Sequence, residues 1–452
     1  MSKIIRLNKG YDINIAGPAV KKSNPNYNSR TYAVKPIDFH GLSPIPKLLV
    51  SEQSEVKAGD PLFYDKSNEQ IKYCSPVSGE VVEIRRGEKR AIEEIVILAD
   101  TDIDYRDFGK SDLSSLSRDV VIEKMIDSGA WLFFKQRPYD IPANPNETPK
   151  AIFISGFDSA PLAPDLNFIM EGKENEFNNG IKVLQTLTSG KIHLSLNAKS
   201  RPCSAFNNAT GVDIHWFEGP HPAGNVGVQI HTIDPINKGE SVWVIHPEDV
   251  ANLGVLFTEG IYRPQRTVAL TGPEVIKPQY FTTLQGASIE SMIADSLVSS
   301  QVRCISGNVL TGRAIESKGH IGFYDHQVTV IYDDKDPELL GWLFPSYPRP
   351  TKSMTYLAYA NEAPAGYRVT TSNNGEERAF VVSGQYESVL PMDIYPVHLI
   401  KAIMARDFDL MEGLGIYEVS EEDFALCEFI CTSKINVMEI IREGLDYMHS
   451  QN

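Results

Sequence analysis

Alternating apolar and polar residues run through the first part of the chain and predict a β domain over residues 1–110. The clearest signal is at residues 80–84 and 91–98, where the two kinds of side chain alternate on either side of Arg-Arg-Gly-Glu. A period of two is typical of strands with one buried face, and a glycine between two such runs is typical of a hairpin turn. We therefore expect two antiparallel strands joined at residues 85–88.

In the rest of this β domain, the spacing of strands and turns is typical of the barrel-sandwich fold that carries biotin or lipoate. Segments 56–63 and 75–82 place glycine and proline between short apolar runs. A carrier presents its lysine on a tight turn that is usually flanked by methionine, and the turn that contains Lys89 has no methionine. We interpret the region as a barrel-sandwich-like β domain with a structural role.

From about residue 111 the chain alternates between helical and strand patterns. Val121, Met125 and Ile126 share one face of a predicted helix, which Gly129 can end. Helical spacing recurs at 177–184 and 250–257, and short apolar strands occur at 151–154, 192–196, 212–216 and 242–245. This order predicts a Rossmann-like α/β domain over residues 111–258, without a cofactor loop.

A smaller α+β unit is predicted next. Extended apolar segments at 267–270 and 303–333 surround a short helix near Met292. A β-grasp fold is the natural candidate for this combination. With a proline-rich connector at 344–350, we place this β-grasp-like domain at residues 259–380.

The last segment, residues 381–452, has helical spacing and predicts a C-terminal helical domain. Ser420 with Asp423, and Asn436 with Glu439, have the pattern of helix N-terminal caps. The predicted fold class is therefore multidomain α/β and β with a helical end.

Charge and apolar content exclude several classes of protein. The 452 residues include 59 acidic and 43 basic side chains, a formal net charge of −16, which argues against nucleic acid as a partner. No apolar run approaches the ~18 residues of a transmembrane helix, and the first residues do not have the pattern of a secretion signal. Five scattered cysteines fit a reducing compartment. We expect a cytoplasmic protein with no transmembrane helix of its own.

An aromatic run followed by two cations is the first candidate for chemistry. Its members are Trp131, Phe133, Phe134, Lys135 and Arg137. Aromatic faces stack on a flat quinone ring, and a cation stabilises the ring oxygen as charge develops on it. We therefore treat these five residues as candidate quinone contacts, with packing in a core as the alternative. The segment 26–40, also rich in aromatic residues, is an alternative contact with membrane partners.

A glycine-rich segment at 219–227, followed by a predicted strand and helix, is the second candidate. Its candidate residues are Gly219, His221, Gly224 and Gly227. Glycine permits positive φ and close approach of a ligand or of another backbone, so we expect a shaped loop where a nucleotide enzyme holds its cofactor. The spacing of His215, His221 and His231 matches no compact metal motif. We expect structural histidines and no metal site.

Cys427 and Cys431 are too few for an iron–sulfur cluster, which takes four thiolates. We expect a packed helix face, and a site shared with another chain is the alternative. The catalytic patterns Gly-x-Ser-x-Gly, His-Glu-x-x-His and the Walker loop do not occur.

Five short sequence segments, in their order and spacing, resemble those of one family. They are Lys-Gly-Tyr-Asp-Ile-Asn-Ile-Ala-Gly at 9–17, Arg-Gly-Glu-Lys-Arg at 86–90, His-Pro-Ala-Gly at 221–224, Val-Ala-Leu-Thr-Gly-Pro at 268–273 and Val-Ser-Gly-Gln-Tyr-Glu-Ser-Val-Leu-Pro-Met at 382–392. With the order of the domains, they resemble the A subunits of the sodium-translocating NADH:quinone oxidoreductases. The flavoprotein subunits of complex I and of Rnf complexes share the same domain plan.

The resemblance implies a peripheral subunit on the cytoplasmic side of the bacterial inner membrane, in a respiratory complex that couples electron transfer from NADH to ubiquinone with sodium export. NADH, flavins and iron–sulfur centres would lie on the other membrane subunits, and this chain would bind no prosthetic group. Where the flavoprotein relatives have a glycine-rich flavin loop, residues 128–138 keep only Gly129 and carry bulky side chains. A phosphate cradle needs small residues, so we expect flavin binding to be lost.

Two other functions remain open at this stage. One is an NADH- and flavin-binding dehydrogenase subunit of the complex I or Rnf type, and the other is a scaffold subunit without any ligand. In the interpretation that we prefer, the translocase activity belongs to the complex, and the isolated chain is inactive.

Overall fold

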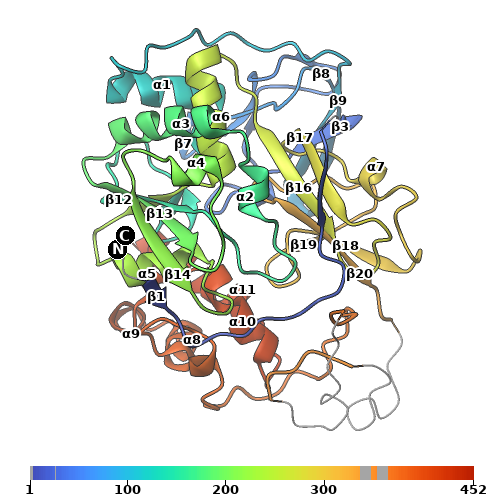
Figure 1. Cartoon of the computed structure of the whole chain (residues 1–452), viewed down its shortest axis with the longest axis vertical. Coiled ribbons are helices and arrows are strands. Elements are labelled where there is room, and N and C mark those ends of the chain that lie inside the picture. Colours follow the sequence, from blue (N-terminus) through green and yellow to red (C-terminus); the bar gives the residue numbers. More distant parts are fainter. Residues whose placement is uncertain (1–3, 26, 336–347, 354–364, 452) are drawn as a thin grey trace.

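An α/β sheet occupies the middle of the molecule in the computed structural model, which describes residues 4–25, 27–335, 348–353 and 365–451. Figure 1 shows helices α1, α3 and α6 above this sheet, the N-terminal β strands and the second large sheet beside it, and the C-terminal helices below it. The predicted connector at 344–350 lies partly outside the described residues.

The N-terminal β domain contains two small antiparallel sheets. One consists of β3 (Thr31–Val34), β9 (Ile92–Ala99), β8 (Gly79–Arg86) and β5 (Glu55–Val56), and the other of β4 (Lys47–Leu48), β6 (Pro61–Asp65) and β7 (Asn68–Cys74). Strands β8 and β9 pair antiparallel and confirm the predicted hairpin, but they are joined at residues 87–91 rather than 85–88, because Arg85 and Arg86 still pair with β9. Phe63, Val81 and Ile95, from both sheets, belong to one core.

The first two strands of the chain pair outside this β domain. Strand β1 (Ile4–Arg6) runs parallel to β14 at the edge of the α/β sheet. Strand β2 (Val20–Asn24) pairs with β17 at the edge of the second large sheet. The segment before residue 25 therefore connects two sheets that are formed by much later parts of the sequence.

Five parallel strands and an antiparallel edge form the α/β sheet. The order is β1, β14 (Asp213–Glu218), β13 (Lys191–Asn197), β12 (Ala151–Ser155), β15 (Val242–Val244), β10 (Lys135–Arg137) and β11 (Ile141–Pro142). The last two strands are antiparallel to their neighbours. The four predicted strands after residue 150 are confirmed in this sheet.

Helices cover both faces of the sheet because alternate residues of its strands are apolar on both sides. Ile152 and Ile154 belong to the core that includes α1 (Arg118–Ser128), α3 (Glu174–Leu187) and α6 (Pro247–Glu259). Ala151 and Phe153 pack instead with residues of α5 (Val226–Ile233). Two single-turn helices, α2 (Leu166–Ile169) and α4 (Ser204–Asn207), lie in the connections.

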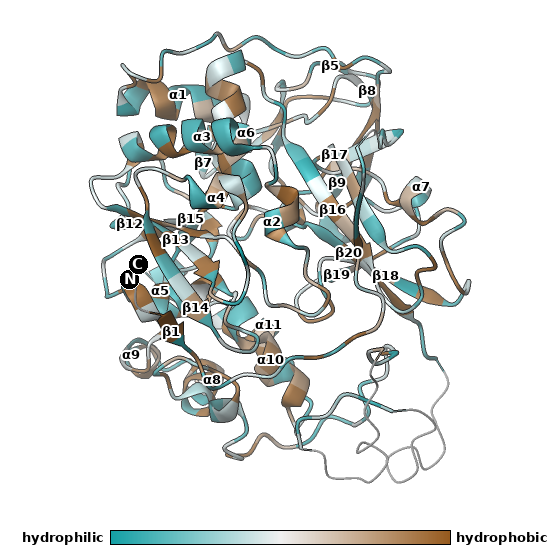
Figure 2. Ribbon diagram, in the orientation of Figure 1, coloured by the Kyte–Doolittle hydropathy of each residue, from teal (hydrophilic) through white to brown (hydrophobic). Residues whose placement is uncertain are grey.

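The surface helices are amphipathic, as the sequence pattern predicts. In Figure 2, α1 and α3 carry both hydrophilic and hydrophobic residues. Gly129 ends α1 with φ of 83°, which confirms its predicted role as a helix stop.

The second large sheet has six strands. Their order is β19 (Arg313–Ile315), β18 (Val302–Ser306), β20 (Gln327–Tyr332), β16 (Gln265–Thr271), β17 (Gln279–Leu284) and β2, with the short helix α7 (Glu290–Ile293) after β17. Strands β16 and β20 are parallel neighbours, and β16 forms an antiparallel hairpin with β17.

The C-terminal helices are α8 (Pro396–Met404), α9 (Phe408–Gly413), α10 (Glu421–Ile430) and α11 (Val437–Gln451), and they share a separate core. Ser420 and Asp423 form the predicted capping box of α10. Asn436 and Glu439 instead bond side chain to side chain, at 3.0 Å. Val228 of α5 joins this core, so the helices pack against the α/β domain. Within the described ranges, no helix combines the length and apolarity that a membrane span needs.

Candidate functional site

A cleft of about 840 Å³ opens where β12 and β15 end. Ser155 and Asp158 line it from the end of β12, and Val244 and His246 line it from the end of β15. The chain runs from β12 to β13 and β14 on one side, whereas β15 lies on the other side of β12. In open parallel sheets, ligands bind outside the carboxyl ends of the strands at such a reversal of strand order. This cleft is therefore the candidate site.

The aromatic run divides between the cleft and the core behind it. Phe133 lines the cleft, near Phe323, with ring centroids 6.3 Å apart. Trp131 and Phe134 have no exposed surface, and both rings pack on Trp243 at centroid distances of 5.3 Å. The indole N–H of Trp131 donates to the backbone oxygen of residue 143 at 2.7 Å. Only one of the three predicted aromatic contacts therefore reaches the cleft.

Both predicted cations line the cleft but are bound to carboxylates of this chain. Lys135 Nζ lies 3.1 Å from Asp140 Oδ2 and 4.4 Å from the ring centroid of Tyr324. Arg137 Nε lies 2.9 Å from Asp140 Oδ1, and its Nη2 donates to Glu422 Oε1 at 2.8 Å. Burial alone would raise the pKa of Asp140, but Arg137, Lys135 and His40 hold this pKa well below its usual value. The two cations are thus neutralised by partners within the protein.

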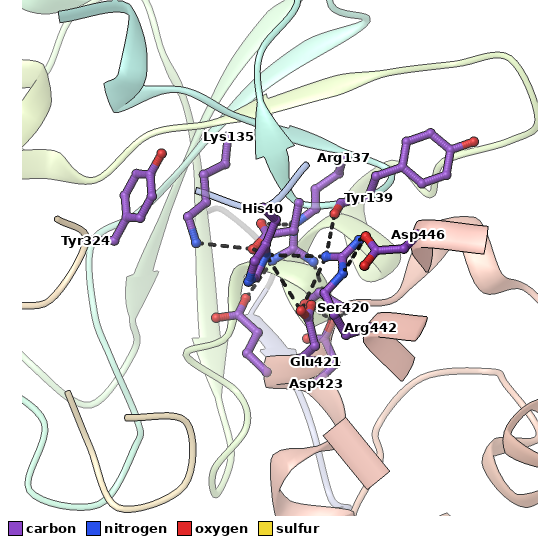
Figure 3. Close-up of polar contacts among 12 residues, drawn as sticks. His40, Lys135, Arg137, Tyr139, Tyr324, Ser420, Glu421, Asp423, Arg442 and Asp446 are labelled. Atoms are coloured by element: carbon purple, nitrogen blue, oxygen red, sulfur yellow. Dashed lines mark hydrogen bonds and ion pairs between the residues drawn. The ribbon is translucent and has the colours of Figure 1, made fainter. Parts of the chain in front are cut away.

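These residues belong to an ion cluster that joins three parts of the fold (Figure 3). His40 comes from the N-terminal β domain, whereas Glu421 and Arg442 come from α10 and α11. Arg442 Nη1 lies 3.3 Å from Glu421 Oε1 and 3.3 Å from His40 Nδ1. His40, Asp140 and Glu421 have the donor atoms of a metal site. Cationic side chains already face these donors, so the geometry favours a domain junction over a cation site.

Asp423 is the deepest acid of the cluster and gives stability a pH dependence. Burial raises its pKa to about 7, although Arg137 opposes this shift. Between about pH 4 and pH 7 the folded protein retains a proton that the unfolded chain releases, so this group's contribution to stability falls as pH rises through that window. In Asp423→Asn, we expect the fall in unfolding free energy between these pH values to be smaller by about 4 kcal/mol.

Urea unfolding of wild type and variant at several pH values measures this difference. Asp409→Asn, at an exposed site of α9, is the control. An unchanged pH profile in Asp423→Asn would show that this carboxyl does not take up the proton.

The glycine-rich segment forms the turn between β14 and α5, and Gly227 lies in the first turn of that helix rather than in the loop. Its glycines allow the protein's own chain to approach closely. A Cβ on Gly224 would stand 2.4 Å from the backbone nitrogen of Ser159, and a Cβ on Gly227 would stand 2.3 Å from an oxygen of Asp423. His221 and Gly224 line the cleft, and both bond to Ser159 Oγ. Burial lowers the pKa of His221 to about 4.

Gly219 lies near the end of β1, where a Cβ would stand 2.7 Å from the backbone oxygen of Leu7. The three histidines around this segment do not converge: His215 pairs with His193 at 3.0 Å, and His231 with Glu418 at 2.6 Å. Cys427 and Cys431 are buried free thiols, and burial raises the pKa of Cys427.

Two stacked histidines and an aspartate line the cleft, and the sequence pattern does not show that they come together. His246 stacks on His326, with ring centroids 3.5 Å apart, and Asp249 lies beside them. Arg266 Nη1 donates to His326 Nε2 at 2.6 Å, and its guanidinium also contacts Asp249 at 3.2 Å. Because arginine occupies these acceptors, the His246, His326 and Asp249 cluster is bonded internally rather than open to a metal ion.

One local signal for His246 exists in the sequence. A histidine followed by proline and two acids after a short apolar strand has the pattern of a helix start. His326 and Arg266 come from the second large sheet, and no local pattern links them to His246.

Comparisons with known proteins divide the chain at similar places. Residues 5–100 match the family model of the NqrA N-terminal barrel-sandwich hybrid domain, residues 116–262 that of the NqrA second alpha/beta domain, and residues 267–317 that of the NQRA C-terminal domain. The barrel-sandwich and α/β expectations are confirmed at this level.

Full-length relatives are similar to the chain from end to end. The A subunit of the Na(+)-translocating NADH-quinone reductase of Vibrio atlanticus is 35% identical over 452 residues, covering 99% of this chain and 100% of the relative. The Yersinia pestis protein of the same name is 35% identical over 451 residues, with the same coverage. Among solved structures, an NAD+-reducing [NiFe]-hydrogenase in the air-oxidized state is 12% identical over 51% of this chain and 52% of that chain, with a TM-score of 0.33, too low to bear on the fold. The full-length similarity and the domain matches show that the chain belongs to the NqrA family, the A subunits of the Na+-translocating NADH-quinone reductases.

Proposed function

We propose that this chain is the NqrA component of a sodium-translocating NADH:ubiquinone reductase and that its cleft accepts the quinone ring. The full-length similarity to relatives with that name supports the first part. The cleft at the reversal of strand order, with an aromatic side chain at its wall, supports the second. Electron transfer and sodium export belong to the assembled complex, and this chain contributes binding and support.

The chemistry of the cleft suits an uncharged flat ring better than a nucleotide. Phe133, Phe323 and Tyr324 line one part of it, and aromatic faces stack on a quinone. Arg137 and Lys135 are held by carboxylates, which would repel a phosphate group. The loop of residues 128–138 fills its space with Trp131 and Phe134, which leaves no cradle of free backbone N–H groups for a flavin phosphate.

The finer assignments of fold are part of this proposal. We assign residues 111–258 to a Rossmann-like domain, supported by parallel strands with helices on both faces. We assign residues 259–380, with the connector, to a β-grasp-like domain, supported by the β16–β17 hairpin and the parallel neighbour β20. Residues 1–110 then form the barrel-sandwich-like domain and residues 381–452 the helical domain.

We place the protein on the cytoplasmic side of the bacterial inner membrane, bound to the membrane subunits of the complex. NADH, flavins and iron–sulfur centres would be held by those partners. This placement depends on the family and on the proposed role. Isolation of the chain from native membranes with its partners would test it.

Quinone binding is tested with ubiquinone-1 titrated against the tryptophan fluorescence of the full chain. We expect saturable quenching, and we expect Phe133→Leu to weaken the affinity about fivefold because it removes ring stacking. Phe206→Leu is the matched control, since Phe206 is buried against Phe177 and does not line the cleft.

Equal affinities for wild type, Phe133→Leu and Phe206→Leu would place the quinone elsewhere and favour a scaffold without a ligand. Flavin absorbance at about 450 nm in the purified chain would favour a flavin-binding dehydrogenase subunit instead.

A further inference from the structure

His246 occupies a position that fixes the orientation of its ring at the cleft. It directly follows the end of β15 and is the N-cap residue of α6, a helix of 13 residues. Its Nδ1 accepts a hydrogen bond from the backbone N–H of Glu248 at 3.2 Å. One face of the ring stacks on His326, and the residue lines the cleft. A cap bond and a stacking contact together hold the imidazole in place.

The cap bond also decides where the imidazole carries its proton. A ring nitrogen that accepts a hydrogen bond carries no proton, so in neutral His246 the proton is on Nε2. Among the residues that the structure describes, Nε2 of His246 has no hydrogen-bond partner. In the same cluster, Nδ1 of His326 and Nε of Arg266 are buried without a hydrogen bond. The cleft therefore contains an oriented N–H donor without a partner from the chain.

The surroundings of His246 keep it uncharged. Burial, and then His326 and Arg266, hold its pKa well below the usual value, and the positive end of the α6 dipole acts in the same direction. Glu248 opposes this shift, but it is already bonded to Lys173 Nζ at 2.6 Å and to Thr267 Oγ1 at 2.7 Å. The imidazole then stays neutral throughout the physiological pH range.

We propose that Nε2–H of His246 donates the hydrogen bond that holds one carbonyl oxygen of a quinone ring in the cleft. The inference rests on the proposed function and names a binding residue that local sequence patterns do not indicate. A quinone is flat and uncharged, with two carbonyl acceptors, so it matches an aromatic wall and a neutral donor.

The test is His246→Asn in the intact complex. Asparagine is a good N-cap residue, so its side-chain oxygen preserves the bond to Glu248, but the shorter side chain cannot replace the Nε2–H donor. We expect KM for ubiquinone-1 to rise about 5- to 10-fold with kcat little changed, and the affinity of the full chain for ubiquinone-1 to fall by the same factor. His215→Asn is the matched control, since His215 pairs with His193 outside the cleft.

Two further readouts separate binding from a structural role. Wild-type affinity should stay constant from about pH 6 to about pH 8.5, because a neutral imidazole does not titrate there. Thermal unfolding of His246→Asn should match the wild type within a few degrees, since the cap is retained.

The outcomes distinguish this inference from the proposed function. If Phe133→Leu weakens ubiquinone-1 binding and His246→Asn does not, the quinone occupies the cleft without a bond to His246. If neither change weakens binding, the proposed site itself fails. Affinity that falls steeply above about pH 6.5 would show a charged donor and overturn the inference.

Discussion

Replacement of Arg137 by methionine should lower the free energy of unfolding by about 3–5 kcal/mol. The guanidinium is almost completely buried and contacts Asp140, Glu422 and Asp423, which come from both sides of the junction between the α/β domain and the C-terminal helices. Without it, Asp140 keeps only Lys135 as a close cationic partner, and Asp423 loses the arginine that faces it, and that loss exceeds the value of the pair itself. Urea unfolding, followed by circular dichroism, measures the change.

Two variants show whether burial is the cause. Arg137→Lys keeps the charge but not the forked geometry, and it should lie between wild type and Arg137→Met. Lys238→Met breaks the ion pair with Glu412, which joins the same two regions at the surface at a distance of 2.8 Å, and it should cost far less than Arg137→Met because water screens an exposed pair. Equal losses for Arg137→Met and Lys238→Met would contradict the role of burial.

Gly254→Ala should destabilise the protein by about 3 kcal/mol, although alanine is the better helix former by about 1 kcal/mol. Gly254 of α6 lies where the helix crosses α3, and a Cβ there would stand 2.0 Å from the backbone oxygen of Glu176. Likewise, a Cβ on Gly180 of α3 would stand 1.9 Å from the backbone oxygen of Val250 in α6. Backbone atoms cannot move aside as a side chain can, so the two helices must separate. Thermal unfolding should show a clearly lower Tm.

Gly413→Ala is the control for Gly254→Ala. Gly413 ends α9, and a Cβ at this position would meet no atom within 4 Å. We expect this change to be neutral or slightly stabilising. A stabilising effect of Gly254→Ala would mean that the two helices do not touch as closely as the structure has them.

The structural features that the sequence predicts correctly are local, and each depends only on residues that are close together in the chain. The hairpin of β8 and β9, the end of α1 at Gly129 and the cap of α10 at Ser420 each need only a few consecutive side chains. The helix and strand order after residue 111 is likewise visible as a change of period. Such features are set by backbone geometry over one or two turns of chain, and a single sequence contains that information.

The site is less predictable because its members come from separate domains. A single turn of 3₁₀ helix, Ala130–Phe133, sends Trp131 into the core and leaves Phe133 at the cleft. The aromatic run alone does not tell which ring faces which side. The partners of Arg137 in α10, Glu422 and Asp423, lie about 285 positions later, so its role at a domain junction has no local signature. Whether these residues touch quinone stays a prediction.

Strand β1 has a consequence for how the protein is made. Arg6 pairs with Glu218, so 212 more residues must be synthesised after this strand before its partner exists. At about 5–20 residues per second, this delay lasts roughly 10–40 s. During that interval the short apolar strand is exposed, and chaperones that bind nascent chains have time to cover it.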